Sequence, residues 1–252
     1  ASRMQRLFSV TLFLCVILIS STGIAQENRE AKELYNKGNA KLKSGDFAGA
    51  VQLYDKALGL EKHQYFFYQR GIALRKSNKE KDAIESFKAA VELAPKFAAA
   101  YNALGSGYFS LKDYNQSISY YERALQENPS LGLAKKGLAA ANTAKANAQS
   151  EAGDLEGAIA SALKAIEADA NYSTAYIILA KSYNKSSKYK EAIAAGQNAL
   201  KKMRTNKGAA YFEIGLGYRN LGKTAEAIKA FTNAKKDPRY SRSADYELKQ
   251  LK

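Results

Sequence analysis

The sequence is poor in the residue types on which most catalytic and metal sites depend. Its 252 residues include one cysteine, one histidine and no tryptophan. One cysteine is too few for a disulfide framework or a cysteine-based zinc site, and one histidine disfavours a histidine-containing catalytic triad or metal cluster. We therefore expect a protein without enzymatic activity, without a cofactor and without a bound metal.

Proline is also scarce. The three prolines exclude a collagen-like chain and a proline-rich linker. Hydrophobic residues make up 46% of the chain and charged residues 25%, which is typical of a folded globular protein and excludes a wholly disordered chain. The length allows one or two domains.

Lysines and arginines outnumber acidic residues, and the excess of positive charge is concentrated in the second half of the chain. The formal net charge is +15, and residues 132–252 hold 21 lysines and arginines against 11 acidic residues. A basic surface attracts anionic polymers, membranes and acidic proteins. Because no arginine-rich run is present, we favour a well-solvated, lysine-rich surface. A basic module that binds an anionic polymer or a membrane surface stays the alternative.

The first 25 residues have the pattern of a signal peptide. Two arginines precede the apolar run Leu7–Ile19, which is shorter than the roughly 20 apolar residues that span a membrane. The small residues Gly23 and Ala25 then form a cleavage-site pattern, so we expect the mature chain to begin at Gln26. This pattern predicts export to a periplasmic or extracellular location, with a bacterial envelope favoured. An uncleaved segment would instead anchor the chain in a membrane.

A repeat occupies the rest of the chain. Pairs of small residues recur six times, with spacings of 33, 34, 41, 34 and 35 residues: Ala50 and Ala57, Ala83 and Ala90, Ser117 and Ala124, Ala158 and Ala165, Ala192 and Ala199, and Ala227 and Ala234. The positions between the members of each pair hold Tyr54, Phe87, Tyr121, Ala162, Gly196 and Phe231. The two small positions keep the same separation in all six pairs, which indicates a repeat protein.

Each pair is preceded by a second periodic segment with a small residue near its centre. These small residues are Gly38, Gly71, Gly105, Ala146, Ala180 and Gly215. Apolar residues recur at intervals of three and four in these segments, which predicts two amphipathic helices in each repeat. Turn-forming pairs such as Gly45-Asp46 separate the two helices, and the three prolines fall between repeats.

The pattern resembles the tetratricopeptide repeat (TPR) family, in which a W-x2-L-G-x2-Y segment is followed by A-x3-F and then by proline. The resemblance covers residues 31–240, with tyrosine, leucine or phenylalanine in place of tryptophan. It implies an all-α, right-handed superhelical solenoid of six helix pairs, with a capping helix over 241–252. Repeats one to three would lie in 26–131 and repeats four to six in 132–240. The 41-residue spacing predicts a lengthened first helix in repeat four.

In TPR proteins the first helices of the repeats line a concave groove. By this resemblance, the residues expected to line the groove are Tyr35, Asn39, Tyr65, Tyr68, Gln69, Arg75, Asn102, Ser106, Lys181 and Asn184. Tyrosine and asparagine suit peptide recognition, because the ring supplies contact area and the amide supplies hydrogen bonds. We therefore predict a scaffold that binds a peptide segment or a protein partner. Packing between repeats is the alternative role of each tyrosine, and self-assembly into a homo-oligomer is an alternative for the chain.

Two motifs that suggest other ligands are disfavoured by their context. Residues 217–224 match the P-loop expression, but they follow a predicted helix rather than a strand, so we expect no nucleotide binding. The TPR variant that grips a C-terminal carboxylate has basic residues where this chain has Tyr35, Ala99 and Ala103. We therefore expect no binding of chaperone tails, and nucleic acid is disfavoured as a partner.

Overall fold

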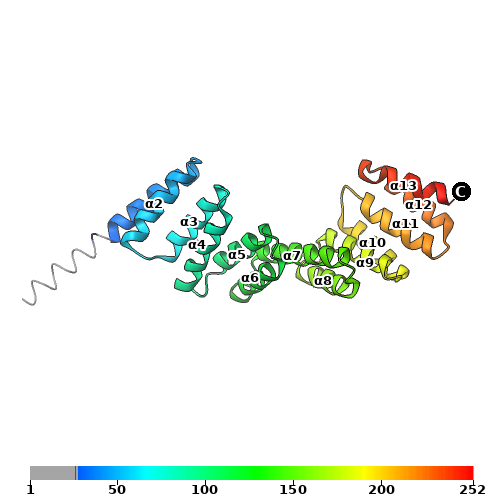
Figure 1. Cartoon of the computed structure of the whole chain (residues 1–252), viewed down its shortest axis with the longest axis horizontal. Helices are drawn as coiled ribbons and strands as arrows, with labels where there is room; N and C mark the ends of the chain where they lie inside the picture. The colour runs from blue at the N-terminus through cyan, green and yellow to red at the C-terminus, as the bar shows by residue number, and fades with distance from the viewer. Residues whose placement is uncertain (1–25, 27, 252) are drawn as a thin grey trace, which may run out of the picture. The chain divides into compact units, whose positions relative to one another are not determined.

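A computed structural model describes residue 26 and residues 28–251 (Figure 1). The predicted signal peptide, 1–25, lies outside the described residues. The regular structure of the described residues is helical, which confirms the all-α prediction. A first helix over 28–43 is followed by α2 (Phe47–Leu60), α3 (Gln64–Lys76), α4 (Glu80–Leu93), α5 (Ala98–Ser110), α6 (Tyr114–Glu127), α7 (Gly132–Glu151), α8 (Leu155–Ala168), α9 (Ser173–Lys185), α10 (Tyr189–Lys202), α11 (Gly208–Asn220), α12 (Thr224–Ala234) and α13 (Pro238–Gln250).

The chain divides into two compact units, Ala1–Gly107 and Tyr108–Lys252, which we call unit 1 and unit 2. The boundary between the two units lies within α5. Within each unit the helices pack in consecutive pairs, such as α3 with α4 and α11 with α12.

In unit 1 the small and bulky positions of the repeat pack against each other. The rings of Tyr54 in α2 and Phe87 in α4 are fully buried. Each ring covers a glycine of the preceding helix, Gly38 or Gly71, and a β-carbon added to Gly71 would lie 2.5 Å from Cε1 of Phe87. The ring therefore occupies the space that a larger side chain on the first helix would need, so the glycine and the ring are complementary in size.

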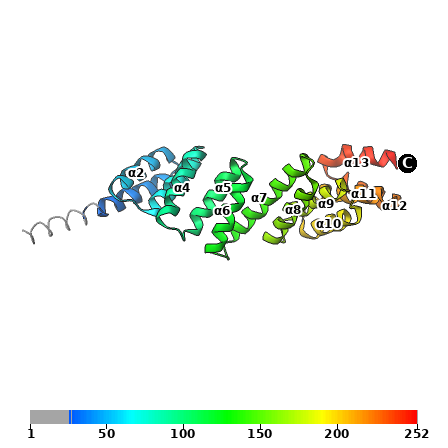
Figure 2. The same cartoon turned by 60° about the horizontal axis from the view of Figure 1, so that its bottom comes forward.

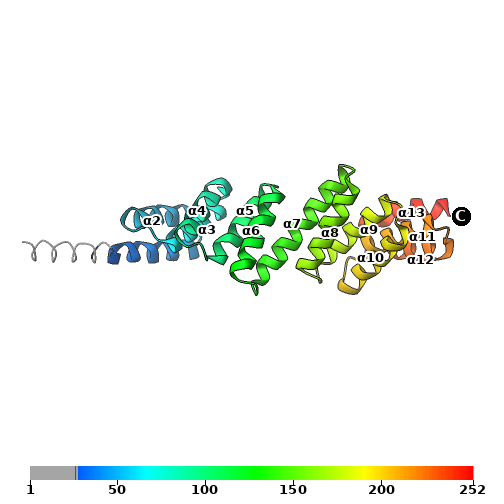
Figure 3. The ribbon, with the colours of Figure 1, turned by 90° about the horizontal axis from the view of Figure 1, so that it is seen from below.

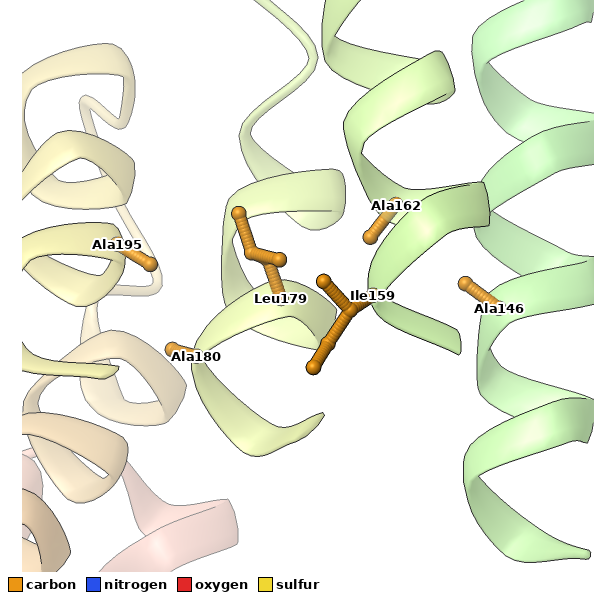
Figure 4. Close-up of a cluster of buried hydrophobic side chains, with 6 residues drawn as sticks. All are labelled: Ala146, Ile159, Ala162, Leu179, Ala180 and Ala195. Atoms are coloured by element: carbon orange, nitrogen blue, oxygen red, sulfur yellow. The ribbon is translucent and has the colours of Figure 1, made fainter. Parts of the chain in front are cut away.

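Unit 2 repeats this arrangement at Phe231, whereas Ala162 and Gly196 take the place of a ring in two of its repeats. Phe231 covers Gly215, where an added β-carbon would lie 2.6 Å from the ring. Between α7 and α10 the bulk comes from Ile159 and Leu179, and alanines of the neighbouring helices close around them (Figure 4). The fully buried core of this part of unit 2 therefore consists mainly of alanine, and Ile166, Ile178 and Tyr183 pack against it from partly buried positions.

The 41-residue interval is occupied by α7, which has 20 residues where α9 and α11 have 13 each (Figure 3). Its buried face consists of alanines and three polar residues. Thr143 Oγ1 donates to Ala139 O at 2.7 Å and Asn142 Nδ2 donates to Leu138 O at 3.1 Å, so these two donors are satisfied within α7. Ser150 Oγ is buried and has no hydrogen-bond partner among the described residues.

The turn within each helix pair contains one residue with a positive φ. These residues are Gly45, Asn78, Lys112, Gly153, Ser187 and Gly222. Left-handed backbone favours glycine and asparagine, which explains the predicted turn pairs. After Gly153, the carboxylate of Asp154 accepts from Gly157 N–H at 2.9 Å and caps α8.

The C-terminal helix begins earlier than the sequence suggested. The expected start lay at 241, whereas α13 begins at Pro238 and is capped by Asp237, which accepts from Arg239 N–H at 3.1 Å. Proline fits the first helical turn because its missing N–H would be unpaired there. α13 packs against α11 and α12 (Figure 2), and its apolar side chains Ala244, Leu248 and Leu251 join their core cluster.

Candidate functional site

Three aromatic rings lie near one another in unit 1, two on α3 and one on the connection before α5. Tyr65 in α3 is 49% exposed, and its ring lies 5.1 Å from that of Phe97 in an edge-to-face arrangement. The ring of Tyr68, one turn further along α3, lies 5.0 Å from the same phenylalanine. Burial raises the pKa of Tyr68, and the charge of Arg75 partly opposes this rise. We call Tyr65, Tyr68 and Phe97 the ring cluster.

Phe97 is a residue that the sequence analysis missed. It lies in the connection between α4 and α5, just before α5 begins, and is half-buried. The expected groove residues all lie on helices, and Phe97 lies on a connection outside the repeat pattern. Its signal was an isolated aromatic residue between Pro95 and the alanine-rich start of α5.

Asn102 lies on α5 and has an unusual polar environment. Its Oδ1 atom is buried and has no hydrogen-bond partner among the described residues. A buried acceptor without a donor costs about 1–3 kcal/mol relative to a satisfied one. Ser106 follows one turn later, is half-buried and has an interaction of its own. A donor from a bound molecule would remove the cost at Asn102.

Other candidates in unit 1 are used within the chain. Tyr35 stacks on Phe66 with ring centroids 4.7 Å apart. Asn39 Oδ1 accepts from Tyr54 Oη at 2.7 Å. For Tyr35 the structure therefore supports the alternative role, packing between repeats, and Asn39 holds a buried ring in place.

Gln69 and Arg75 lie on the same helix as the ring cluster and are half-buried. The guanidinium of Arg75 lies 5.6 Å from the centre of the Phe87 ring. Its charge also opposes the rise in the pKa of Glu80 that burial causes. Arg75 thus lies beside both a buried ring and a partly buried acid.

In unit 2, Lys181 and Asn184 belong to a polar network on the first helices. Asn184 Nδ2 donates to the main-chain oxygen of Glu213 at 2.9 Å and to its Oε2 at 2.8 Å, while Asn184 Oδ1 is buried without a partner among the described residues. Lys181 Nζ donates to Asn147 Oδ1 at 3.4 Å. Burial raises the pKa of Glu213, opposed by the Asn184 hydrogen bond and by the charges of Lys181 and Lys185.

This network joins successive first helices in unit 2. Lys185 Nζ donates to Ser150 O at 2.9 Å, which links α9 to α7. Arg219 in α11 pairs with Glu247 in α13, which is buried. Lys181 and Asn184, which were expected to line the groove, are both bonded to neighbouring helices. Two acids were not anticipated from the sequence: Glu213, which accepts from Asn184, and Glu247, which pairs with Arg219.

Two other kinds of site were sought in the part of the chain that the structure describes. No group of three or more histidine, cysteine, aspartate or glutamate side chains there could hold a metal ion. No described helix has both the length and the apolar surface needed to cross a membrane. Residues 217–224, which match the P-loop expression, form the end of α11 and its turn, with Gly222 at φ +72°.

Comparison with known families agrees with this architecture. Models described as tetratricopeptide repeat match residues 35–95, 98–131, 143–210 and 209–238. One of these models, matched at 35–95 and 143–210, alone covers half of the chain. The chain belongs to the tetratricopeptide repeat family. It is accordingly a protein–protein interaction module built from TPR helix pairs.

Individual relatives cover parts of this TPR protein. It is 32% identical over 112 residues to small glutamine-rich tetratricopeptide repeat-containing protein 2 of Mycosarcoma maydis, covering 44% of this chain and 32% of that one. It is 33% identical over 117 residues to the Hsp70-Hsp90 organizing protein of Triticum aestivum, covering 46% and 20%. The chain thus spans less than a third of the length of either relative. Enzymes are also among the relatives that match.

A solved structure shares more of the TPR array. The MamA protein superposes with a TM-score of 0.56 at 26% identity, over 69% of this chain and 91% of MamA. This similarity extends over more of the chain than the two sequence relatives described above.

Proposed function

We propose that this TPR protein is a non-enzymatic scaffold whose unit 1 binds a peptide segment of a partner protein across α3 and α5. One observation carries the proposal: Asn102 Oδ1 is buried and lacks a hydrogen-bond donor. By the repeat register, Asn102 belongs to the same row of first-helix positions as Tyr68 on α3. A main-chain N–H of the peptide would satisfy this oxygen.

The ring cluster supplies the second half of the recognition. Tyr65 is about half exposed, and Tyr68 and Phe97 are half-buried, so a ligand would find apolar ring surface that is already fixed by packing. Rigid aromatic side chains give contact area at little cost in conformational entropy. A peptide with an apolar side chain next to an exposed main-chain N–H is the ligand that fits both features.

The chemistry of the partner differs from that of a C-terminal carboxylate held by basic residues. The positions that would be basic in such a clamp hold Tyr35, Ala99 and Ala103. The wheat relative is named for Hsp70 and Hsp90, but this chain lacks the cations that would hold a terminal carboxylate. We propose an internal segment as the ligand, so amidation of a peptide's C-terminus is expected to leave its affinity unchanged.

The proposal also includes export of the protein and the absence of catalytic activity. The apolar run Leu7–Ile19 supports export, with a mature chain from Gln26 in a periplasmic or extracellular compartment. The single histidine, His63, accepts from Tyr65 N–H through Nδ1 and caps α3 rather than serving an acid–base role. Mass spectrometry of the exported protein tests the predicted N-terminus, and a retained Leu7–Ile19 would show an anchor instead.

Peptides selected from a random phage-displayed library against the wild-type protein test the site. Affinities measured by fluorescence polarisation should fall by about 1–3 kcal/mol in the Tyr68→Ala/Asn102→Ala variant if both residues are hot spots. The matched control is Tyr246→Ala/Asn220→Ala, which removes the same side-chain types from exposed positions of unit 2. Equal affinity of the first variant and the wild type, or an equal loss in the control, would refute the proposed site.

A further inference from the structure

Two adjoining cavities in unit 2 lie away from the first-helix residues considered so far. One, of about 270 Å³, is lined by residues of α10, α11 and α12, among them Leu200, Ile214 and Tyr218. The other, of about 420 Å³, lies at the connections before α11 and α13 and is lined by Arg204, Lys207 and Lys236 among others. They share two lining residues, Tyr211 and Asn233, and so form one continuous surface.

The two cavities differ in chemistry. Leu200 and Tyr218 of the first cavity pack against the buried core of Ile193, Ile214 and Ala230, so its floor is apolar and fixed. Its rim carries polar side chains, Gln197, Glu226, Lys229 and Asn233. We call it the apolar cavity. Its volume lies just below that of ordinary small-molecule pockets, about 300–1,000 Å³, and suits a single side chain.

The second cavity, which we call the basic cavity, has an uncompensated positive charge. Arg204, Lys207 and Lys236 make no ion pair with any described residue, and Lys236 Nζ is bonded only to the neutral Asn233, at 2.9 Å. The one acid in its lining, Asp237, is paired with Arg239 through contacts of 2.7 and 3.0 Å. That pairing holds the pKa of Asp237 below its usual range and offsets its charge.

We infer that these joined cavities form a second peptide site, which takes a bulky apolar side chain in the apolar cavity and neighbouring carboxylates in the basic cavity. Charge complementarity selects the occupant: three cations without partners favour an acidic segment. The site lies on α10, α11 and α12 of unit 2, whereas the proposed groove lies on α3 and α5 of unit 1. The inference is therefore independent of the proposed function.

Isothermal titration calorimetry on the full chain tests the inference with an acetylated and amidated hexapeptide of glycine, aspartate, glutamate, leucine, phenylalanine and glycine. Lys207→Glu/Lys236→Glu should weaken binding about tenfold or more. The matched control is Lys62→Glu/Lys79→Glu, an equal change of charge at exposed lysines of unit 1. The control should bind within about twofold of the wild type, as should Tyr68→Ala/Asn102→Ala.

Four outcomes would overturn the inference. One is no binding at about 1 mM hexapeptide. Another is an equal loss in the unit 1 control, which would indicate general attraction to a basic protein. A third is equal binding of a hexapeptide with asparagine and glutamine in place of the acids. The last is tighter saturable binding of sodium octanoate than of the hexapeptide, which would assign the cavities to a free amphiphilic anion instead of a peptide.

Discussion

The pairing of Gly71 with Phe87 gives a quantitative test of how the repeat packs. A β-carbon on Gly71 would lie 2.5, 2.7 and 2.9 Å from three atoms of the Phe87 ring, well inside ordinary contact at 3.4–4 Å. The ring is fully buried and has no free space to retreat into. Gly71→Ala would gain roughly 0.5–1 kcal/mol of helix propensity. It would lose about 1–3 kcal/mol to overpacking, so we expect a net loss of about 1–2 kcal/mol.

A smaller side chain at position 87 should rescue the alanine. Phe87→Leu alone removes part of a ring whose full truncation costs about 3–5 kcal/mol, and we expect it to cost about 1–2 kcal/mol. In the Gly71→Ala/Phe87→Leu double variant the new methyl group enters the space that the ring has vacated. The double variant should therefore be destabilised by about 1 kcal/mol less than the sum of the single variants.

The measurement is urea unfolding followed by circular dichroism, with hydrogen exchange of the α3 and α4 amides alongside. Exchange is needed because repeat arrays open in parts, so a single transition can hide a local effect. The pair Gly215→Ala/Phe231→Leu repeats the cycle in unit 2, where the corresponding distance is 2.6 Å. Additive losses in both cycles would show that glycine and ring do not compete for the same space, and would refute this account of the packing.

Three further predictions concern unit 2. Burial raises the pKa of Glu213 above its usual range, so ionisation of this group opposes folding as pH rises. The melting temperature of Glu213→Gln should therefore rise relative to that of the wild type between pH 4 and 7.5, and a difference that stays constant with pH would contradict this. Asp154→Ala should lose about 0.5–2 kcal/mol in urea unfolding, and Asp154→Asn much less. The buried face of α7 consists of alanines and polar groups, so we expect its amide hydrogens to exchange faster than those of α12. Equal protection of the two helices would show that α7 is not more weakly packed than α12.

The helix pairs could be predicted from the sequence because the residue types at several recurring positions independently indicate the same packing of two helices. Gly71 and Phe87 lie in separate helices. A glycine at one repeat position and a large ring at the other are explained only if the two helices are in contact. Turn residues such as Gly45 and Gly153 fixed the ends of the helices independently. The start of α13 was misplaced because Pro238 was interpreted as a separator between repeats, whereas it occupies the first turn of that helix.

The binding face was less predictable, because a repeat column does not reveal which group faces it on the next helix. Tyr35 and Tyr68 belong to the same column, but Tyr35 stacks on Phe66 while Tyr68 joins the exposed ring cluster. Phe97 lies outside the helices and outside the columns. The repeat period therefore identified the positions that could line a groove. It could not show which side chains at those positions already pack against or bond to another helix.

Three asparagines on first helices show what decides between packing and binding. Asn39 Oδ1 accepts from the buried Tyr54, so this oxygen is committed to the fold. Asn184 is bonded to Glu213 through its amide nitrogen, but its Oδ1 is buried without a partner among the described residues, as is Asn102 Oδ1. Asn102 differs because the ring cluster supplies aromatic surface in the same unit. Because an unpaired buried acceptor raises the free energy of the unliganded protein, a ligand that donates to it recovers that cost on binding. An unpaired buried acceptor together with aromatic surface, as at Asn102, therefore favours a binding site more than an unpaired acceptor alone, and an asparagine of another first helix, such as Asn39, can be purely structural.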